Sequence, residues 1–190
     1  GFAMPGTEGT WYGVTVDSGT QLATVISLAY NNLTGSLPPA LGLLTGLTTL
    51  ALDHNALTGS VPAEVGNLTN LVQFNLNANQ LSGSIPVQLG NLTKLQFLNF
   101  GTNLLTGSIP PELGALTALR TLNLYDNRLE GSIPPELGNL TALTAELALG
   151  VNQLTGPIPA EFGSFVNLRT LWLNDNRLSG PIPAGLGNLV

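Results

Sequence analysis

The chain has 190 residues, of which 43% are hydrophobic and only 8% are charged, and its formal net charge at pH 7 is −6. All five basic residues lie from Lys94 onward, so the chain lacks the basic stripe that binds nucleic-acid phosphates. It has no cysteine, which excludes disulfides, thiolate metal sites and a cysteine nucleophile. The length predicts one domain with one continuous core, and no stretch approaches the roughly 18 apolar residues of a membrane span.

Residues 1–24 do not match the pattern of the remaining chain, and we predict that they form an N-terminal cap. The segment from Trp11 to Val16 is an alternating apolar run, as expected for a strand with one buried face. Such a strand would pair beside the first unit of the fold that follows. It would cover the apolar side chains and the strand edge that the end of a repetitive fold otherwise exposes.

Residues 25–190 consist of seven copies of Leu-x-x-Leu-x-Leu-x-x-Asn-x-Leu-x-Gly-x-Ile-Pro, clearest from Leu119 to Pro134. The copies repeat every 24 residues, except that the fifth interval has 25 because one residue is inserted near Thr144. A fixed period of this length indicates a solenoid in which each unit packs on its neighbours. The seventh copy is truncated at Val190, and we expect the chain to be a fragment of a longer protein.

Each copy contains a Leu-x-Leu segment with the alternation of a half-buried strand, so stacked copies predict a parallel sheet. The asparagine that follows lies where the chain turns and leaves peptide groups without partners. Its amide both donates and accepts hydrogen bonds, which predicts a structural ladder between repeats. The ladder consists of Asn31, Asn55, Asn79, Asn103, Asn127, Asn152 and Asn176. The glycine four residues further on is predicted to have positive φ, and the next proline to fix φ at a corner.

The motif resembles the plant-type leucine-rich repeat of receptor-kinase ectodomains, polygalacturonase-inhibiting proteins and algal or other protist repeat proteins. The resemblance implies an α/β solenoid, a right-handed curved superhelix with a parallel β-sheet on its concave face. It further implies a second short sheet at the Thr-Gly-Ser-Ile-Pro segments and 3₁₀ or short helices on the convex side. Recognition rather than catalysis is implied, in pathogen sensing or within a larger receptor or scaffold.

The N-terminal segment departs from the resemblance at one position. Secreted plant members carry cysteine where Val16 follows Trp11-Tyr12-Gly13-Val14-Thr15 here. This difference favours a protist or cytosolic relative over a plant secretory protein. The sequence is compatible with both an extracellular and a cytoplasmic location, because some extracellular chains contain no disulfide.

The exposed positions of the concave strands vary between copies and therefore hold the candidate ligand-binding residues. Phe97, Tyr125 and Trp172 are the expected anchors, because an exposed aromatic ring is a good anchor in an interface. Asn75, Asn99 and Asn123 are the expected hydrogen-bonding groups. The whole candidate set is Tyr30, Asp53, His54, Gln73, Asn75, Phe97, Asn99, Thr121, Asn123, Tyr125, Asp126, Trp172 and Asn174.

A protein or peptide is the expected ligand of this face, and a glycan is the other class that it would accept. His54 beside Asp53 is the only candidate for acid–base chemistry, and no serine, second histidine or carboxylate cluster accompanies it at catalytic spacing. The sequence also lacks a phosphate loop and the spacings of zinc or calcium sites. We therefore expect no enzyme activity, no metal and no cofactor.

The second sheet offers an alternative site of a different kind. Its small hydroxyl side chains would form two ranks on a weakly charged lattice, which would bind ice or a crystalline polysaccharide. The clearest members are Thr34, Ser36, Thr58, Ser60, Ser82, Ser84, Thr106 and Ser108. Glu130 interrupts the first rank, and Pro157 and Pro181 interrupt the second.

Overall fold

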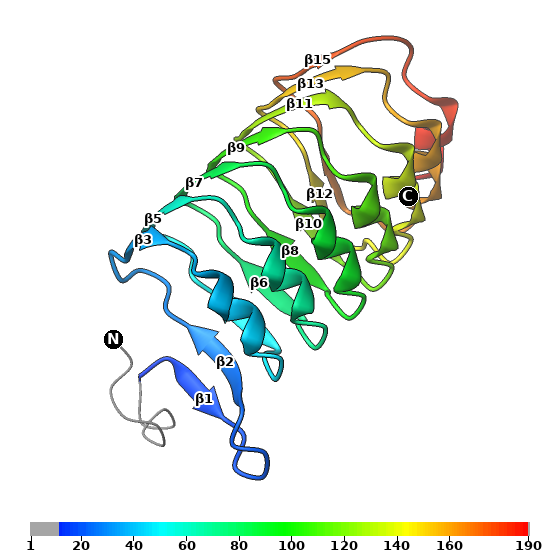
Figure 1. Ribbon diagram of the computed structural model, residues 1–190. Helices are drawn as coiled ribbons and strands as arrows, with labels where there is room; N and C mark the ends of the chain where they lie inside the picture. Colours follow the sequence, from blue (N-terminus) through cyan, green and yellow to red (C-terminus); the bar gives the residue numbers. More distant parts are fainter. Residues whose placement is uncertain (1–11, 190) are drawn as a thin grey trace.

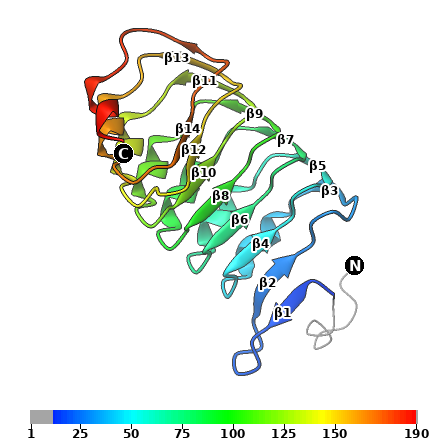
Figure 2. The same cartoon turned by 180° about the vertical axis from the view of Figure 1, so that it is seen from behind.

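The structure is a computed structural model that describes residues 12–189, so Trp11, the preceding lead and Val190 lie outside the described part. The chain winds into a right-handed curved solenoid with a sheet on its concave face and 3₁₀ helices opposite (Figures 1 and 2). Seven turns are present in the described part, and each contributes a strand to each of two sheets. The predicted α/β solenoid of seven leucine-rich repeats is confirmed.

The larger sheet has eight strands within residues 12–189, and all neighbours except the first pair are parallel. Repeat-equivalent residues pair directly, so Leu122 lies between Leu98 and Leu147. The strands in sheet order are β1 (Val14–Val16), β2 (Ala23–Ser27), β4 (Thr49–Ala51), β6 (Gln73–Asn75), β8 (Phe97–Asn99), β10 (Thr121–Asn123), β12 (Glu146–Ala148) and β14 (Thr170–Trp172).

Strand β1 lies antiparallel to β2 at the edge of this sheet, with Val14 opposite Ile26. The backbone N–H of Ser27 donates to the carbonyl of Gly13 at 2.7 Å. Gly13 has φ +86, and a Cβ there would collide with the Ser27 carbonyl oxygen, so only glycine fits this contact. The turn after β1 is held by Asp17, and hydrogen bonds from the hydroxyl and N–H of Thr20 lower the pKa of its carboxyl.

The inserted residue lies directly before β12. The N–H groups of Thr144 and Ala145 both approach the carbonyl of Arg120, at 3.4 and 3.1 Å. In other turns the equivalent carbonyl accepts from the residue before the strand and from the first strand residue, as Gln96 does from Arg120 and Thr121. Strand β12 nevertheless stays in register, with Glu146 opposite Thr121. The insertion therefore distorts only the two exposed residues directly before the strand.

The smaller sheet runs along one edge of the solenoid (Figure 1) and is parallel throughout its seven described strands. The pairing of its strands is staggered relative to the repeat. Thr58 lies opposite Ser36, which is 22 residues earlier in the chain, whereas the repeat has 24 residues. The strands are β3 (Thr34–Ser36), β5 (Ala56–Gly59), β7 (Gln80–Gly83), β9 (Leu104–Gly107), β11 (Arg128–Ser132), β13 (Gln153–Gly156) and β15 (Arg177–Leu178).

A 3₁₀ helix follows each strand of the smaller sheet and forms the convex side. Each begins after a proline with φ between −75° and −58°, which confirms the predicted corner. Neighbouring helices pack closely, since a Cβ on Gly66 would lie 2.6 Å from the carbonyl oxygen of Gln88. The helices are η2 (Pro39–Leu43), η3 (Ala63–Asn67), η4 (Val87–Asn91), η5 (Pro111–Ala115), η6 (Pro135–Asn139), η7 (Ala160–Ser164) and η8 (Ala184–Asn188).

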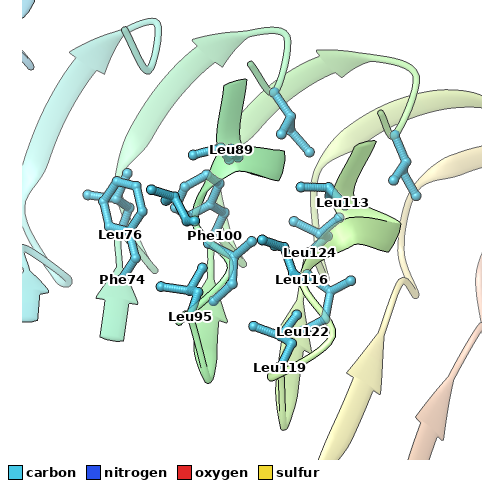
Figure 3. Close-up of a cluster of buried hydrophobic side chains, with 14 of the residues drawn as sticks. Phe74, Leu76, Leu89, Leu95, Phe100, Leu113, Leu116, Leu119, Leu122 and Leu124 are labelled. Carbon is cyan, nitrogen blue, oxygen red and sulfur yellow. The ribbon is translucent and has the colours of Figure 1, made fainter. Parts of the chain in front are cut away.

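The core is a continuous column of leucines between the larger sheet and the helices (Figure 3). Leu119, Leu122 and Leu124 of one turn are fully buried and pack against the equivalent residues of the turns beside it. Phe74 and Phe100 meet edge to face, with ring centroids 5.0 Å apart. Each buried side chain of this size stabilises the fold by about 1.5–3 kcal/mol, so the stability comes from contacts between neighbouring turns.

The ladder asparagines connect each turn to both of its neighbours. The amide nitrogen of Asn103 donates to the carbonyls of Phe100 and Gly101 in its own turn and of Leu76 in the preceding turn. Its oxygen accepts from the N–H of Leu81 at 3.0 Å. The same pattern recurs at Asn79, Asn127, Asn152 and Asn176.

Asn103→Ala should be one of the most destabilising substitutions outside the leucine core. It removes four hydrogen bonds from a buried side chain and leaves backbone groups without partners, a loss of about 2–4 kcal/mol. For a domain of this size that lowers Tm by roughly 5–15 °C. The control is Asn31→Ala, whose exposed amide donates one bond, to the Ala29 carbonyl. Equal melting shifts for the two variants, measured by circular dichroism, would contradict the ladder's role.

Candidate functional site

The exposed face of the larger sheet presents the variable side chains, because the residues between them point into the core. In β10, Leu122 is fully buried while Thr121 and Asn123 are half-buried. The residues after each strand continue this surface as the chain leaves the sheet, with Tyr125 and Asp126 half-buried. We call the exposed face of β2 to β14, with the three residues after each strand, the concave face.

Tyr125 and Trp172 form an aromatic pair at the C-terminal half of the concave face. Their rings meet edge to face with centroids 5.7 Å apart, although the residues lie two turns from each other. Gly150 of the turn between them permits this contact, since a Cβ there would lie 3.0 Å from a ring carbon of Tyr125. Trp172 remains 44% exposed. The pair therefore presents a fixed apolar surface to solvent.

Three asparagines line the centre of the concave face, and their side-chain oxygens are already engaged. The oxygen of Asn75 accepts from the N–H of Asn77, and Asn99 and Asn123 make the equivalent bonds at 3.0 Å to Gly101 and Tyr125. These bonds fix the side chains. The amide nitrogen of Asn123 lies 3.4 Å from Glu146, whereas those of Asn75 and Asn99 donate to no protein group within residues 12–189.

A second cluster lies at the N-terminal half of the concave face. The rings of Tyr30 and His54 stack with centroids 4.2 Å apart and an interplanar angle of 14°. Nδ1 of His54 lies 3.0 Å from Oδ2 of Asp53, and because an ionised carboxylate only accepts, the imidazole donates. Tyr30 is 72% exposed, so one face of the stack is open to solvent.

The other predicted site residues occupy the concave face without joining either cluster. Gln73 is exposed, and Phe97 and Thr121 are half-buried in the same row of paired residues. Phe97 takes part in no aromatic pair among the described residues. Asn174 lies beside Gly150 and donates to Asp175 at 2.6 Å.

The position before each ladder asparagine has a constraint that the sequence did not reveal. It adopts a left-handed backbone with φ between 50° and 58° in every turn. Single residues with side chains in this region cost roughly 1 kcal/mol or more. The seven residues are Tyr30, His54, Ala78, Thr102, Asp126, Val151 and Asp175. The seven residues differ widely in type and none is glycine, so the sequence did not indicate a left-handed backbone at these positions.

The hydroxyl residues of the smaller sheet are exposed, apart from half-buried Ser82. The two ranks are offset by the staggered pairing, so Thr58 lies opposite Ser36 rather than Thr34. Because no lysine, arginine, aspartate or glutamate occurs in β3, β5, β7 or β9, these four strands present an uncharged surface. Arg128 and Glu130 of β11 end it.

Other kinds of site have no support in the part of the chain that the structure describes. No group of three histidine, cysteine or acidic residues lies close enough to hold a metal ion within residues 12–189. None of the described helices has the length and apolar character to cross a bilayer. The contact between His54 and Asp53 is the only close contact between an acidic and a basic side chain among the described residues.

The solenoid resembles solved plant structures at high TM-scores. It is 39% identical, at a TM-score of 0.86, to the ectodomain of the Arabidopsis thaliana receptor kinase GASSHO1/SCHENGEN3 in complex with CASPARIAN STRIP INTEGRITY FACTOR 2, covering 95% of this chain and 25% of that one. The plant peptide hormone receptor RGFR1 in complex with RGF2 is 37% identical at a TM-score of 0.71, covering 83% and 29%. A plant ice-binding protein is 29% identical at a TM-score of 0.79, covering 90% and 63%.

The chain thus spans about a quarter of the length of the two receptor ectodomains. No curated protein matches it. A curved solenoid of this kind, with fixed leucines inside and variable side chains on its concave face, is the architecture that the chain shares with these receptor ectodomains. Residues 23–44, 46–68, 70–92, 94–116, 118–140 and 167–189 match the model of the Leucine Rich Repeat. The chain belongs to the leucine-rich repeat family.

Val151→Asn should stabilise the protein, because a β-branched residue is strained at φ 53 whereas asparagine tolerates this conformation. Relief of about 1 kcal/mol raises Tm by roughly 2–4 °C. The control is Asp126→Asn, which exchanges two residues that both tolerate φ 55 and should leave Tm unchanged. A Tm for Val151→Asn equal to or below that of the parent chain would contradict the strain at this position.

Proposed function

We propose that the chain is a recognition module that binds a peptide, or an extended segment of a protein, across its concave face. The observation that carries the proposal is the Tyr125–Trp172 pair, which holds an indole 44% exposed on an ordered surface. A large ring in this position loses little entropy when a partner covers it. The receptors similar to this chain, which include a peptide hormone receptor, support the same class of ligand.

The proposed interface combines the aromatic pair with hydrogen bonds from the central asparagines. The oxygens of Asn75 and Asn99 are held by their own turns, so their amide nitrogens are oriented toward solvent at fixed positions. Such donors suit the carbonyl groups of an extended peptide. Because they are already ordered, binding costs less side-chain entropy than it would on a flexible surface.

We place this module within a larger receptor or scaffold, and a glycan is the other ligand class that the concave face would accept. The chain covers only 25% and 29% of the two receptor chains, which supports a place within a larger protein. The exposed aromatic rings support a glycan ligand, because sugar rings also stack on aromatic side chains.

Replacing Tyr125 and Trp172 together by alanine should weaken the capture of a bound peptide at least tenfold, since central aromatic anchors contribute about 2 kcal/mol or more each. Titration calorimetry with a peptide selected on the parent chain measures the effect. The control is Val87→Ala on helix η4, which removes a side chain of similar exposure, 48%, from the convex side. Unimpaired binding by the double variant would remove the concave face from the proposal.

A second candidate function rests on the smaller sheet. We propose, as the alternative, that the uncharged hydroxyl surface of β3, β5, β7 and β9 binds ice or a crystalline polysaccharide. The similarity to a plant ice-binding protein supports it. Regularly spaced small hydroxyls on a surface without charges are suited to an ordered, neutral lattice. The staggered register makes this lattice oblique, and half-buried Ser82 leaves a shallow gap in it.

Ser60→Lys tests the alternative, because it places a charge among the exposed hydroxyls. If the surface binds ice, the parent chain at millimolar concentration should show thermal hysteresis or shape ice crystals, and the variant should lose most of either effect. The control is Ser132→Lys, at the same position of a turn that already carries Arg128 and Glu130. Absence of both effects in the parent chain, with no adsorption to crystalline cellulose or chitin, would eliminate the alternative.

A further inference from the structure

The geometry points to a binding site for an arginine side chain of the ligand at Asp53 and the Tyr30–His54 stack. This inference rests on the proposed peptide-binding function and specifies its ligand. Asp53 is the one carboxylate on the concave face of the first four turns, and residues 12–93 contain no lysine or arginine. Within the described residues, His54 is the only basic side chain in contact with its carboxylate.

The carboxylate of Asp53 has an oxygen left for a ligand. His54 engages Oδ2, and Oδ1 accepts no hydrogen bond within residues 12–189. No buried side-chain oxygen in the described part lacks a partner, so Oδ1 must be reachable from solvent. The side chain is only 13% exposed. A hydrogen-bonded cation there would meet a partly desolvated charge, which strengthens the attraction compared with a fully exposed carboxylate.

Several residues next to Asp53 on the concave face have small side chains. Ala29 has the position equivalent to Asp53 in the preceding turn, and Ser27 and Ala51, two residues before Ala29 and Asp53, pair with each other in the sheet. Two residues nearby are larger. Tyr30 follows Ala29, and Asn77 has the position equivalent to Asp53 in the following turn. Only the register of the larger sheet shows that these residues are neighbours.

The Tyr30–His54 stack adds a surface for the same ligand group. His54 covers one face of the tyrosine ring, and Tyr30 is still 72% exposed. A guanidinium is planar, donates hydrogen bonds in the plane of the group and also stacks on aromatic faces. Arginine therefore suits a carboxylate beside an aromatic stack better than lysine, which offers a point charge without a stacking plane.

The spacing between the two clusters sets the spacing in the ligand. Three strand intervals separate β4 from β10, and five separate β4 from β14. At about 4.8 Å per interval these are roughly 14 and 24 Å, which an extended peptide spans in about four to seven residues. The ligand that we infer has an arginine and a bulky apolar residue separated by that number of positions.

A random twelve-residue peptide library displayed on phage, selected on the immobilised chain at about 0.15 M salt, tests this inference. We expect arginine to be enriched at four to seven positions from a large apolar residue. Selection on Asp53→Asn should lose that enrichment, and a peptide selected on the parent chain should bind the variant about tenfold more weakly. The matched control is Glu64→Gln on helix η3, which makes the same charge change on the convex side.

Equal arginine enrichment on the parent chain and on Asp53→Asn would overturn the inference, as would selected peptides without arginine. Tyr30→Ala provides a second variant, and its affinity for the selected peptide should also fall. Trp172→Ala separates the two proposals. If it abolishes binding while Asp53→Asn does not affect it, the arginine site fails and the concave face stands. If neither variant affects binding, or no peptide is selected, both proposals fail.

Discussion

The buried amide of the ladder asparagine is the interaction on which the solenoid depends. At the end of every strand the chain turns away from the sheet, and carbonyl and N–H groups of two turns would be left without partners in the interior. The amide of Asn103 binds two carbonyls of its own turn and, across that boundary, one carbonyl and one N–H of the preceding turn. Leucine burial supplies most of the stabilising free energy, but it has no directional preference. The amide ladder fixes how one turn sits on the next.

The residue types on the concave face can therefore vary without changing the fold. Because the leucines and asparagines determine the register, neighbouring strands bring repeat-equivalent residues side by side whatever those residues are. Tyr125 and Trp172 occupy different positions of the repeat and lie two turns apart, yet they meet because Gly150 in the turn between them leaves space for the Tyr125 ring. The same register brings Tyr30 against His54. The freedom has a cost at one position in each turn, where the left-handed backbone must be accommodated by residues as unsuited to it as Val151.

The repeat motif was sufficient to predict the seven turns, the buried leucines and the glycines with positive φ, because each depends on local spacing. Three features were not accessible from the sequence. The staggered pairing of the smaller sheet depends on the angle at which the chain leaves each turn. The internal bonds of Asn75, Asn99 and Asn123 depend on the backbone after the strand. The role of Gly150 depends on which ring lies above it. Periodicity predicts neighbours but not rotamers.

The two sheets offer surfaces of different chemistry, and we propose that the ordered side chains of the concave face bind the ligand. Hydroxyl-radical footprinting of the chain with a selected peptide tests this claim most directly, since it reports which side chains the ligand covers. We predict that labelling of Tyr125, Trp172 and Tyr30 falls on binding, while exposed Val87 and Ile182 are labelled as before. Unchanged labelling of the three aromatic residues, with protection of Leu104 on the smaller sheet, would contradict it.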